Sequence, residues 1–116
     1  MADAPEVSPR TLVAALAQRG PLVLLDVREP FERAFCAIPV HASVVDLHVP
    51  VGQIQARLGW LRGECAGHPV VVYCHHGVRS RMVVDWLARQ GFTGLQNLAG
   101  GVDAWSRDVD PKLPRY

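Results

Sequence analysis

The sequence has few cysteines and no excess of charge of either sign. Its 116 residues contain 12 Lys and Arg against 11 Asp and Glu, which gives a formal net charge of +1. This balance argues against a nucleic-acid-binding domain and against a polybasic membrane-surface protein. The three cysteines are odd in number and form no Cys-x-x-Cys pair. We therefore expect neither a disulfide framework nor a thioredoxin-like redox site.

Long hydrophobic runs, internal repeats and linker-like segments are also missing. Residues 1–8 carry Asp3 and Glu6 and no apolar run, so we expect no signal peptide, no membrane anchor and a cytoplasmic location. Apolar residues make up 49 % of the chain, enough to bury a core without disulfides or a structural metal. We expect a single domain over residues 1–116, with its core at about 8–107 and an irregular tail at 108–116.

Helical and extended patterns alternate along the chain. Ser8 and Pro9 resemble a helix start, and short apolar runs bounded by Gly or Pro resemble buried strands. The expected helices cover about 8–20, 31–35, 51–61, 79–91 and 102–105, and the expected strands 22–27, 44–45, 69–73 and 95–98. Strands separated by helices predict an α/β domain with a central parallel sheet and helices on both faces.

Three polar or glycine-rich segments follow these strands, at 26–28, 74–80 and 99–101. Ligands of parallel sheets bind beyond the carboxyl ends of the strands, so we expect the chemistry where these segments meet. Cys74 lies between a strand and a helix, in a short loop that holds Gly77. The backbone N–H groups of such a loop and the helix N-terminus favour an anion, which makes Cys74 the candidate nucleophile.

Two arginines are placed against the local electrostatic preference. Arg79 and Arg81 lie in the first turn of the helix after Cys74, where the helix dipole disfavours cations. Local rules are most often broken at functional sites, so we expect a local positive field that binds an anionic substrate.

The motifs resemble those of the rhodanese family of sulfurtransferases, in its single-domain form. The segment Tyr73 to Ser80 is similar to the family's active-site loop, Leu25 to Glu29 to its early strand motif, and Asn97 to Trp105 to its late glycine-tryptophan motif. The resemblance implies transfer of sulfane sulfur from a small anionic donor such as thiosulfate, through a persulfide on Cys74, to cyanide, a thiol or a protein acceptor. It implies no cofactor. We expect a monomer or weak homodimer.

The residues around Cys74 are expected to have supporting roles. The substrate-binding loop would comprise His75, His76, Gly77, Val78, Arg79 and Ser80. Asp26 and Arg28 are expected to form a charged network that braces this loop, completed by Glu29, and Gly100 with Gly101 to allow close backbone approach. His75 and His76 are expected to point outward and select the acceptor. Trp86 and Trp105 are expected in the core.

Other polar residues receive structural interpretations. Cys36 and Cys65 are expected to be single buried thiols, and His41 and His48 to be surface histidines. Cys65, Cys74, His75 and His76 match no zinc spacing, so no metal site is expected. Val40 stands where the family usually has glycine; because valine resists a positive φ, the turn within 36–45 is expected to differ.

Two alternatives stay open. A related phosphatase or arsenate reductase also uses a loop cysteine and an arginine, but it needs five residues between them, whereas four separate Cys74 from Arg79. A non-turnover persulfide carrier or a regulatory binding module would have the same sequence pattern as the enzyme.

Overall fold

The computed structural model describes residues 5–116. The expectation about a signal peptide falls partly on residues 1–4, outside this range. The strands are β1 (Glu6–Val7), β2 (Val23–Asp26), β3 (Val45–His48), β4 (Val70–Tyr73) and β5 (Leu95–Leu98). The helices are α1 (Pro9–Ala17), α2 (Pro30–Phe35), α3 (Leu58–Cys65), α4 (Val78–Arg89) and α5 (Gly101–Asp108), with the 3-10 helix η1 at Val51–Gln53. No helix within residues 5–116 is long and apolar enough to cross a membrane.

The predicted parallel sheet is confirmed. The strands follow the order β1-β5-β4-β2-β3, and every neighbouring pair is parallel. The register places Asp26 opposite Tyr73 on one side and opposite His48 on the other. The carboxyl ends of the central strands therefore lie side by side at one edge of the sheet, where the polar segments 26–28 and 74–80 begin.

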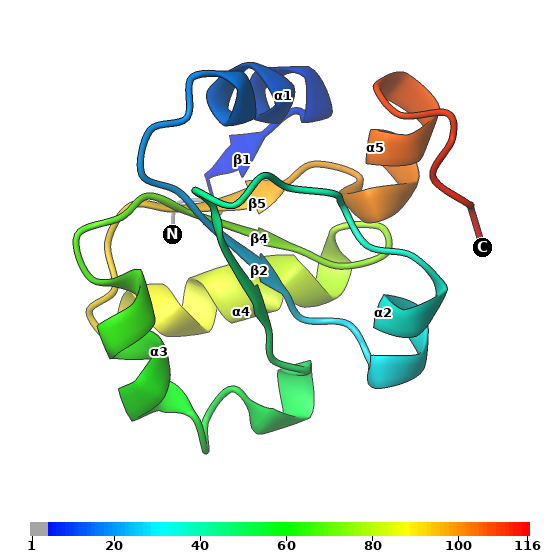
Figure 1. Cartoon of the computed structure of the whole chain (residues 1–116). Helices are drawn as coiled ribbons and strands as arrows, with labels where there is room; N and C mark the ends of the chain where they lie inside the picture. Colours follow the sequence, from blue (N-terminus) through cyan, green and yellow to red (C-terminus); the bar gives the residue numbers. More distant parts are fainter. Residues whose placement is uncertain (1–4) are drawn as a thin grey trace.

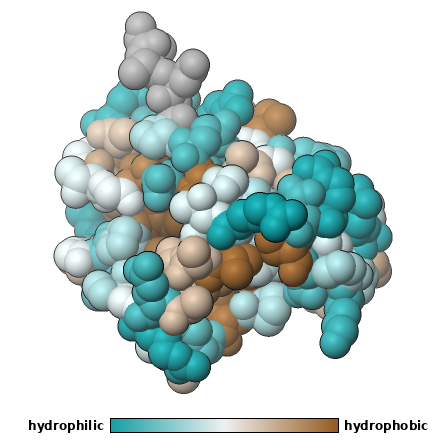
Figure 2. Space-filling model, turned by 90° about the horizontal axis from the view of Figure 1, so that it is seen from above, coloured by the Kyte–Doolittle hydropathy of each residue, from teal (hydrophilic) through white to brown (hydrophobic). Residues whose placement is uncertain are grey.

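Helices cover both faces of the sheet, as expected, with α1 and α5 on one face and α3 and α4 on the other (Figure 1). Successive residues of a strand point to opposite faces, so Leu24 packs toward α1 and α5 while Leu25 packs toward α3 and α4. Trp105 is buried and Trp86 is half-buried against the core. Seen from above, the surface is a mosaic in which hydrophobic side chains show between hydrophilic ones (Figure 2).

The predicted helix at 51–61 is wrong in its extent. Only Val51–Gln53 forms a 3-10 helix, a turn follows, and the α-helix begins at Leu58. Apolar residues three apart suit a 3-10 helix or a turn as well as an α-helix, and Gly52 and Gly59 lower the helix propensity. The two-residue strand β1 was also missed, because it is too short to show an alternating pattern.

The segment around Val40 has no regular structure, and its turn lies after the valine. The Val44 N–H donates to the His41 carbonyl over 3.1 Å. Among the described residues, Arg19 is the one non-glycine with a positive φ, so Val40 avoids the conformation that valine resists.

Candidate functional site

Cys74 lies directly after β4, beneath the loop that leads into α4. Its Sγ accepts hydrogen bonds from the Gly77 N–H at 3.1 Å and the Ser80 N–H at 3.4 Å, and lies 3.2 Å from the Ser80 hydroxyl. Gly77 permits this curl because its φ of 100° is in the left-handed region that favours glycine. Two backbone N–H donors at one sulfur, at the N-terminus of a helix, suit a sulfur anion.

The N-terminus of α5 fixes the opposite side of the loop. The Val102 N–H donates to the Cys74 carbonyl at 2.9 Å, and the Asp103 N–H donates to the His75 carbonyl at 3.1 Å. A Cβ on Gly101 would lie 2.5 Å from the Cys74 carbonyl oxygen, so the predicted close approach is confirmed, and Gly101 makes it. With these carbonyls turned toward α5, the amides of Gly77 and Ser80 face Sγ.

Asn97 on β5 supports the loop from below. Its Nδ2 donates to the Gly77 carbonyl at 3.1 Å and to Glu6 at 2.9 Å, and its Oδ1 lies within hydrogen-bond distance of the Ser80 hydroxyl. The single hydrogen of Ser80 can point to Asn97 or to Cys74. Asn97 therefore positions the hydroxyl that faces the sulfur, a role that the sequence analysis did not assign.

Asp26 and Arg28 form the predicted network at the adjacent strand end, and both are fully buried. The Arg28 guanidinium donates to both oxygens of the Asp26 carboxylate, from Nε at 2.9 Å and from Nη2 at 2.8 Å. Burial lowers the pKa of Arg28, but hydrogen bonds to Asp26 and Tyr116 outweigh it and raise the pKa above its usual range. Nη2 also donates to the Cys36 carbonyl. The pair ties β2 to the segment after α2.

Arg79 is held by a carboxylate that the sequence analysis did not single out. Its Nη1 and Nη2 donate to Glu32 on α2 at 2.6 and 2.9 Å. These hydrogen bonds outweigh burial and lower the pKa of Glu32 to about 2. The pKa of Arg79 is raised, chiefly by Glu32 and in smaller part by the charge of Cys74. Glu32, rather than Glu29, is the carboxylate that links the network to the loop.

The Glu32 pair predicts acid sensitivity. The pKa of Glu32 in the folded protein, about 2, lies below the ordinary 4.5. The stabilisation of the folded state by the ionised Glu32 is therefore complete well above pH 4.5 and is lost as the pH falls toward 2. The shift corresponds to about 3 kcal/mol. We expect Glu32→Gln to be less stable than the wild type at pH 7 and to lose less stability between pH 5 and pH 2.5, measured by urea unfolding.

A matched control separates this pair from an exposed one. Asp108 pairs with Arg107 on the surface, so Asp108→Asn is expected to change stability little at either pH. Equal acid-side slopes for the wild type and Glu32→Gln would contradict the prediction.

The tail reaches back across the sheet edge and ends at this site. Tyr116 donates its hydroxyl to Glu32 at 2.8 Å and accepts from Arg28 at 2.9 Å. Its ring stacks on His75 at 3.8 Å between centroids and lies against Phe35 at 5.5 Å. Burial, followed by the charge of His76, lowers the pKa of His75. The tail is irregular, as predicted, but the sequence analysis missed its docking.

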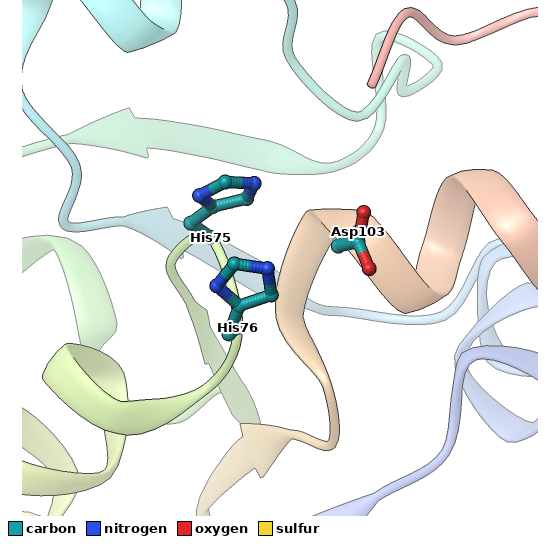
Figure 3. Close-up of side chains that lie close together, drawn as sticks. All are labelled: His75, His76 and Asp103. Atoms are coloured by element: carbon teal, nitrogen blue, oxygen red, sulfur yellow. The ribbon is translucent and has the colours of Figure 1, made fainter. Parts of the chain in front are cut away.

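His75 and His76 differ in exposure. His76 is exposed as expected, whereas His75 is half-buried and stacked between His76 and Tyr116. With Asp103 on α5 they bring nitrogen and oxygen ligand atoms within 4.8 Å of one another (Figure 3). This is the group within residues 5–116 that could hold a metal ion.

The structure also places the other residues that the sequence analysis named. The expected positive field is reduced, because Arg81 pairs with Glu6 at 2.8 Å just as Arg79 pairs with Glu32. Val78 is exposed at the loop. Gly100 has a φ of 73° and precedes α5. Cys36 and Cys65 are buried free thiols, as expected. His41 and His48 were expected at the surface, but both are half-buried, and a ring nitrogen of each hydrogen-bonds a backbone carbonyl, that of Leu16 for His41 and that of Arg28 for His48.

Comparison with known proteins gives consistent matches. Residues 8–108 match the model of the rhodanese-like domain. The chain is 32 % identical over 102 residues to a protein of Allochromatium vinosum named "Sulfurtransferase", with 88 % of each chain covered. The human single-domain sulfurtransferase TSTD1 has 27 % identity and a TM-score of 0.71, over 90 % of this chain and 97 % of that one.

Longer proteins contain a similar segment. The chain is 35 % identical to "Adenylyltransferase and sulfurtransferase MOCS3-1" of Zea mays over 107 residues, which are 87 % of this chain. It spans 22 % of the length of that protein. A rhodanese-like domain protein of Staphylococcus aureus has 26 % identity and a TM-score of 0.76, over 97 % of this chain and 98 % of that one.

Proposed function

Since the chain belongs to the rhodanese-like domain family, we propose that it is a sulfurtransferase that carries sulfane sulfur as a persulfide on Cys74. The observation that carries this proposal is the donor set around Sγ, formed by the Gly77 and Ser80 amides, with the Ser80 hydroxyl beside them. Such a set stabilises negative charge on sulfur. Relatives that carry the name sulfurtransferase support it.

The chemistry is a double displacement. The Cys74 thiolate attacks the outer sulfur of thiosulfate; a new S–S bond forms, the S–S bond of the donor breaks, and sulfite leaves with the electron pair. Cyanide or a thiolate acceptor then attacks the outer sulfur of the persulfide, and Cys74 leaves as the thiolate. The loop amides hold the charge in both states. Cys74 is 1 % exposed, which favours a donor whose outer sulfur is unhindered.

Mass spectrometry of the intact protein after thiosulfate treatment tests the proposal. We expect the mass of one added sulfur atom, located on the peptide that contains Cys74, and its removal by cyanide with formation of thiocyanate. The Cys65→Ala variant serves as the control and should gain the same sulfur. An unchanged mass in both proteins would contradict the proposal.

The alternatives give different outcomes in the same assays. A persulfide on Cys74 that cyanide does not remove would indicate a carrier or a regulatory module. Hydrolysis of p-nitrophenyl phosphate without persulfide formation would indicate the phosphatase. Four residues separate Cys74 from Arg79 where such a phosphatase needs five, which argues against the phosphatase, whereas the cyanide step distinguishes the carrier or regulatory module from the enzyme.

We also propose that Arg79, positioned by Glu32, attracts the anionic donor. Replacing Arg79 by alanine is expected to raise the KM for thiosulfate by about ten- to a hundredfold, the usual effect of losing one hydrogen bond to a charged group. The reaction of preformed persulfide with cyanide is expected to change less. Steady-state and single-turnover kinetics measure the two steps.

Arg81 provides the matched control for Arg79. It lies in the same helical turn, carries the same charge and pairs with the exposed Glu6, so Arg81→Ala should leave KM within about twofold of the wild type. An equal rise in KM for both variants would show a general charge effect and contradict a role for Arg79.

A further inference from the structure

Three side chains with metal-ligand chemistry meet beside the Cys74 loop. His75 and His76 come from the loop, and Asp103 comes from the first turn of α5, which donates to the carbonyl of His75. Their ligand atoms lie within 4.8 Å of one another (Figure 3). Two imidazoles and one carboxylate with an open position are a known ligand set for Zn²⁺. The donors of a tetrahedral site lie roughly 3.3 Å apart, so small side-chain rotations would bring them to that spacing.

One of these groups has an unsatisfied polar atom. His75 Nε2 is buried and has no hydrogen-bond partner among the described residues. A buried nitrogen without a partner is costly, and a metal ion would satisfy it. His76 is exposed, and the half-buried Asp103 lies in the first turn of α5.

The tail occupies the same groups. Arg115 donates to Asp103 through Nε at 2.9 Å and Nη2 at 3.2 Å. Tyr116, the next residue, stacks on His75 with an angle of 8° between the rings. A metal on Asp103 would have to displace Arg115, and rotation of His75 would disturb the stack. Metal and tail are therefore alternative partners of one cluster.

We propose that His75, His76 and Asp103 bind a divalent transition-metal ion such as Zn²⁺, in competition with the Arg115–Tyr116 tail. On binding, the ion exchanges water ligands for the two imidazoles and the carboxylate, and Arg115 returns to solvent. Because the two partners exclude each other, whatever loosens the tail strengthens metal binding, by at most the factor by which the tail is loosened. The inference does not depend on sulfur transfer.

Calorimetric titration of the full chain with Zn²⁺ tests the site. Cys74→Ser is used as the background, so that no thiolate in the loop adds a ligand. We expect one ion per chain, and binding at least tenfold weaker after His76→Ala or Asp103→Asn. His68→Ala is the control, since His68 precedes β4 at the other end of the strand, and it should bind as the background does. Mg²⁺, which prefers oxygen ligands, should not bind.

The tail is tested by one more pair of variants. Arg115→Ala frees Asp103 and should tighten Zn²⁺ binding about two- to fivefold, while Lys112→Ala removes the same charge from the exposed tail and should not. Absence of saturable Zn²⁺ binding, or equal affinity in the His76, Asp103 and His68 variants, would overturn the site. Equal effects of Arg115→Ala and Lys112→Ala would overturn the competition. Thermal unfolding of each variant shows that it is folded.

Discussion

Replacing Cys74 by serine is expected to lower the rate of thiocyanate formation from thiosulfate and cyanide at least about a thousandfold. A serine hydroxyl is almost entirely protonated at neutral pH and forms no persulfide. The fold should be retained, because the oxygen fits beneath the Gly77 and Ser80 donors that now face Sγ. Intact-mass analysis should show no added sulfur, and circular dichroism should show an unchanged spectrum.

Cys65 is the matched control for this experiment. It is another buried thiol, on α3 in the same core cluster as Cys74, and burial raises its pKa to about 11. It is therefore protonated at neutral pH and poorly nucleophilic. Cys65→Ala should retain the wild-type rate within about twofold. Loss of activity in Cys65→Ala, with activity kept in Cys74→Ser, would show that Cys65 is the nucleophile and would contradict the assignment of Cys74.

The strands and the Cys74 loop were predictable because their signals are local. Three consecutive valines at 70–72 suit a strand covered on both faces, and Gly77 marks the turn into the next helix. The parallel order followed from the alternation of helices and strands. These features predict that Cys74, Asp26 and Gly101 lie at one edge of the sheet, and the register of β2 with β4 confirms that edge.

The charge pairing at the site was not predictable in the same way. Arg79 and Glu32 lie 47 positions apart, and Tyr116 lies 84 positions from Glu32, so no spacing rule relates them. Glu32 also has a local role, because its Oε1 accepts the Glu29 N–H as part of a capping box. The acids at 29 and 32 are a pattern that predicts a capped start of α2. That local pattern does not predict that the Glu32 carboxylate also pairs with Arg79.

The contacts of the tail could not be predicted from the sequence either. Pro111 and Pro114 indicated irregular backbone, which the structure confirms, but an irregular segment carries no pattern that predicts which residues it contacts. Arg115 and Tyr116 had no motif, yet they contact Asp103, His75, Glu32 and Arg28. Each contact depends on the direction that the chain takes after the turn at 111–113. That direction is set by the packing of α5 and the segment after it, where Ser106 hydrogen-bonds the Leu113 carbonyl.

Asp26→Ala is expected to cost about 3–5 kcal/mol of folding free energy, because it leaves the guanidinium of Arg28 buried without a countercharge. Both side chains are 0 % exposed and joined by two hydrogen bonds. This loss is a large part of the roughly 5–15 kcal/mol that stabilises a domain, so the Tm should fall by about 10–20 °C. Thermal and urea unfolding measure it.

Two further variants show whether the effect arises from the buried charge. Asp46 binds the same Arg33 that contacts Asp26, but it is exposed, so Asp46→Ala should cost less than about 1 kcal/mol. Combining Asp26→Ala with Arg28→Met removes both charges and should be more stable than Asp26→Ala alone, since an apolar replacement of a buried pair is often near neutral. A double variant no more stable than the single one would mean that the hydrogen bonds of Arg28 to Cys36 and Tyr116, rather than its charge, determine the loss.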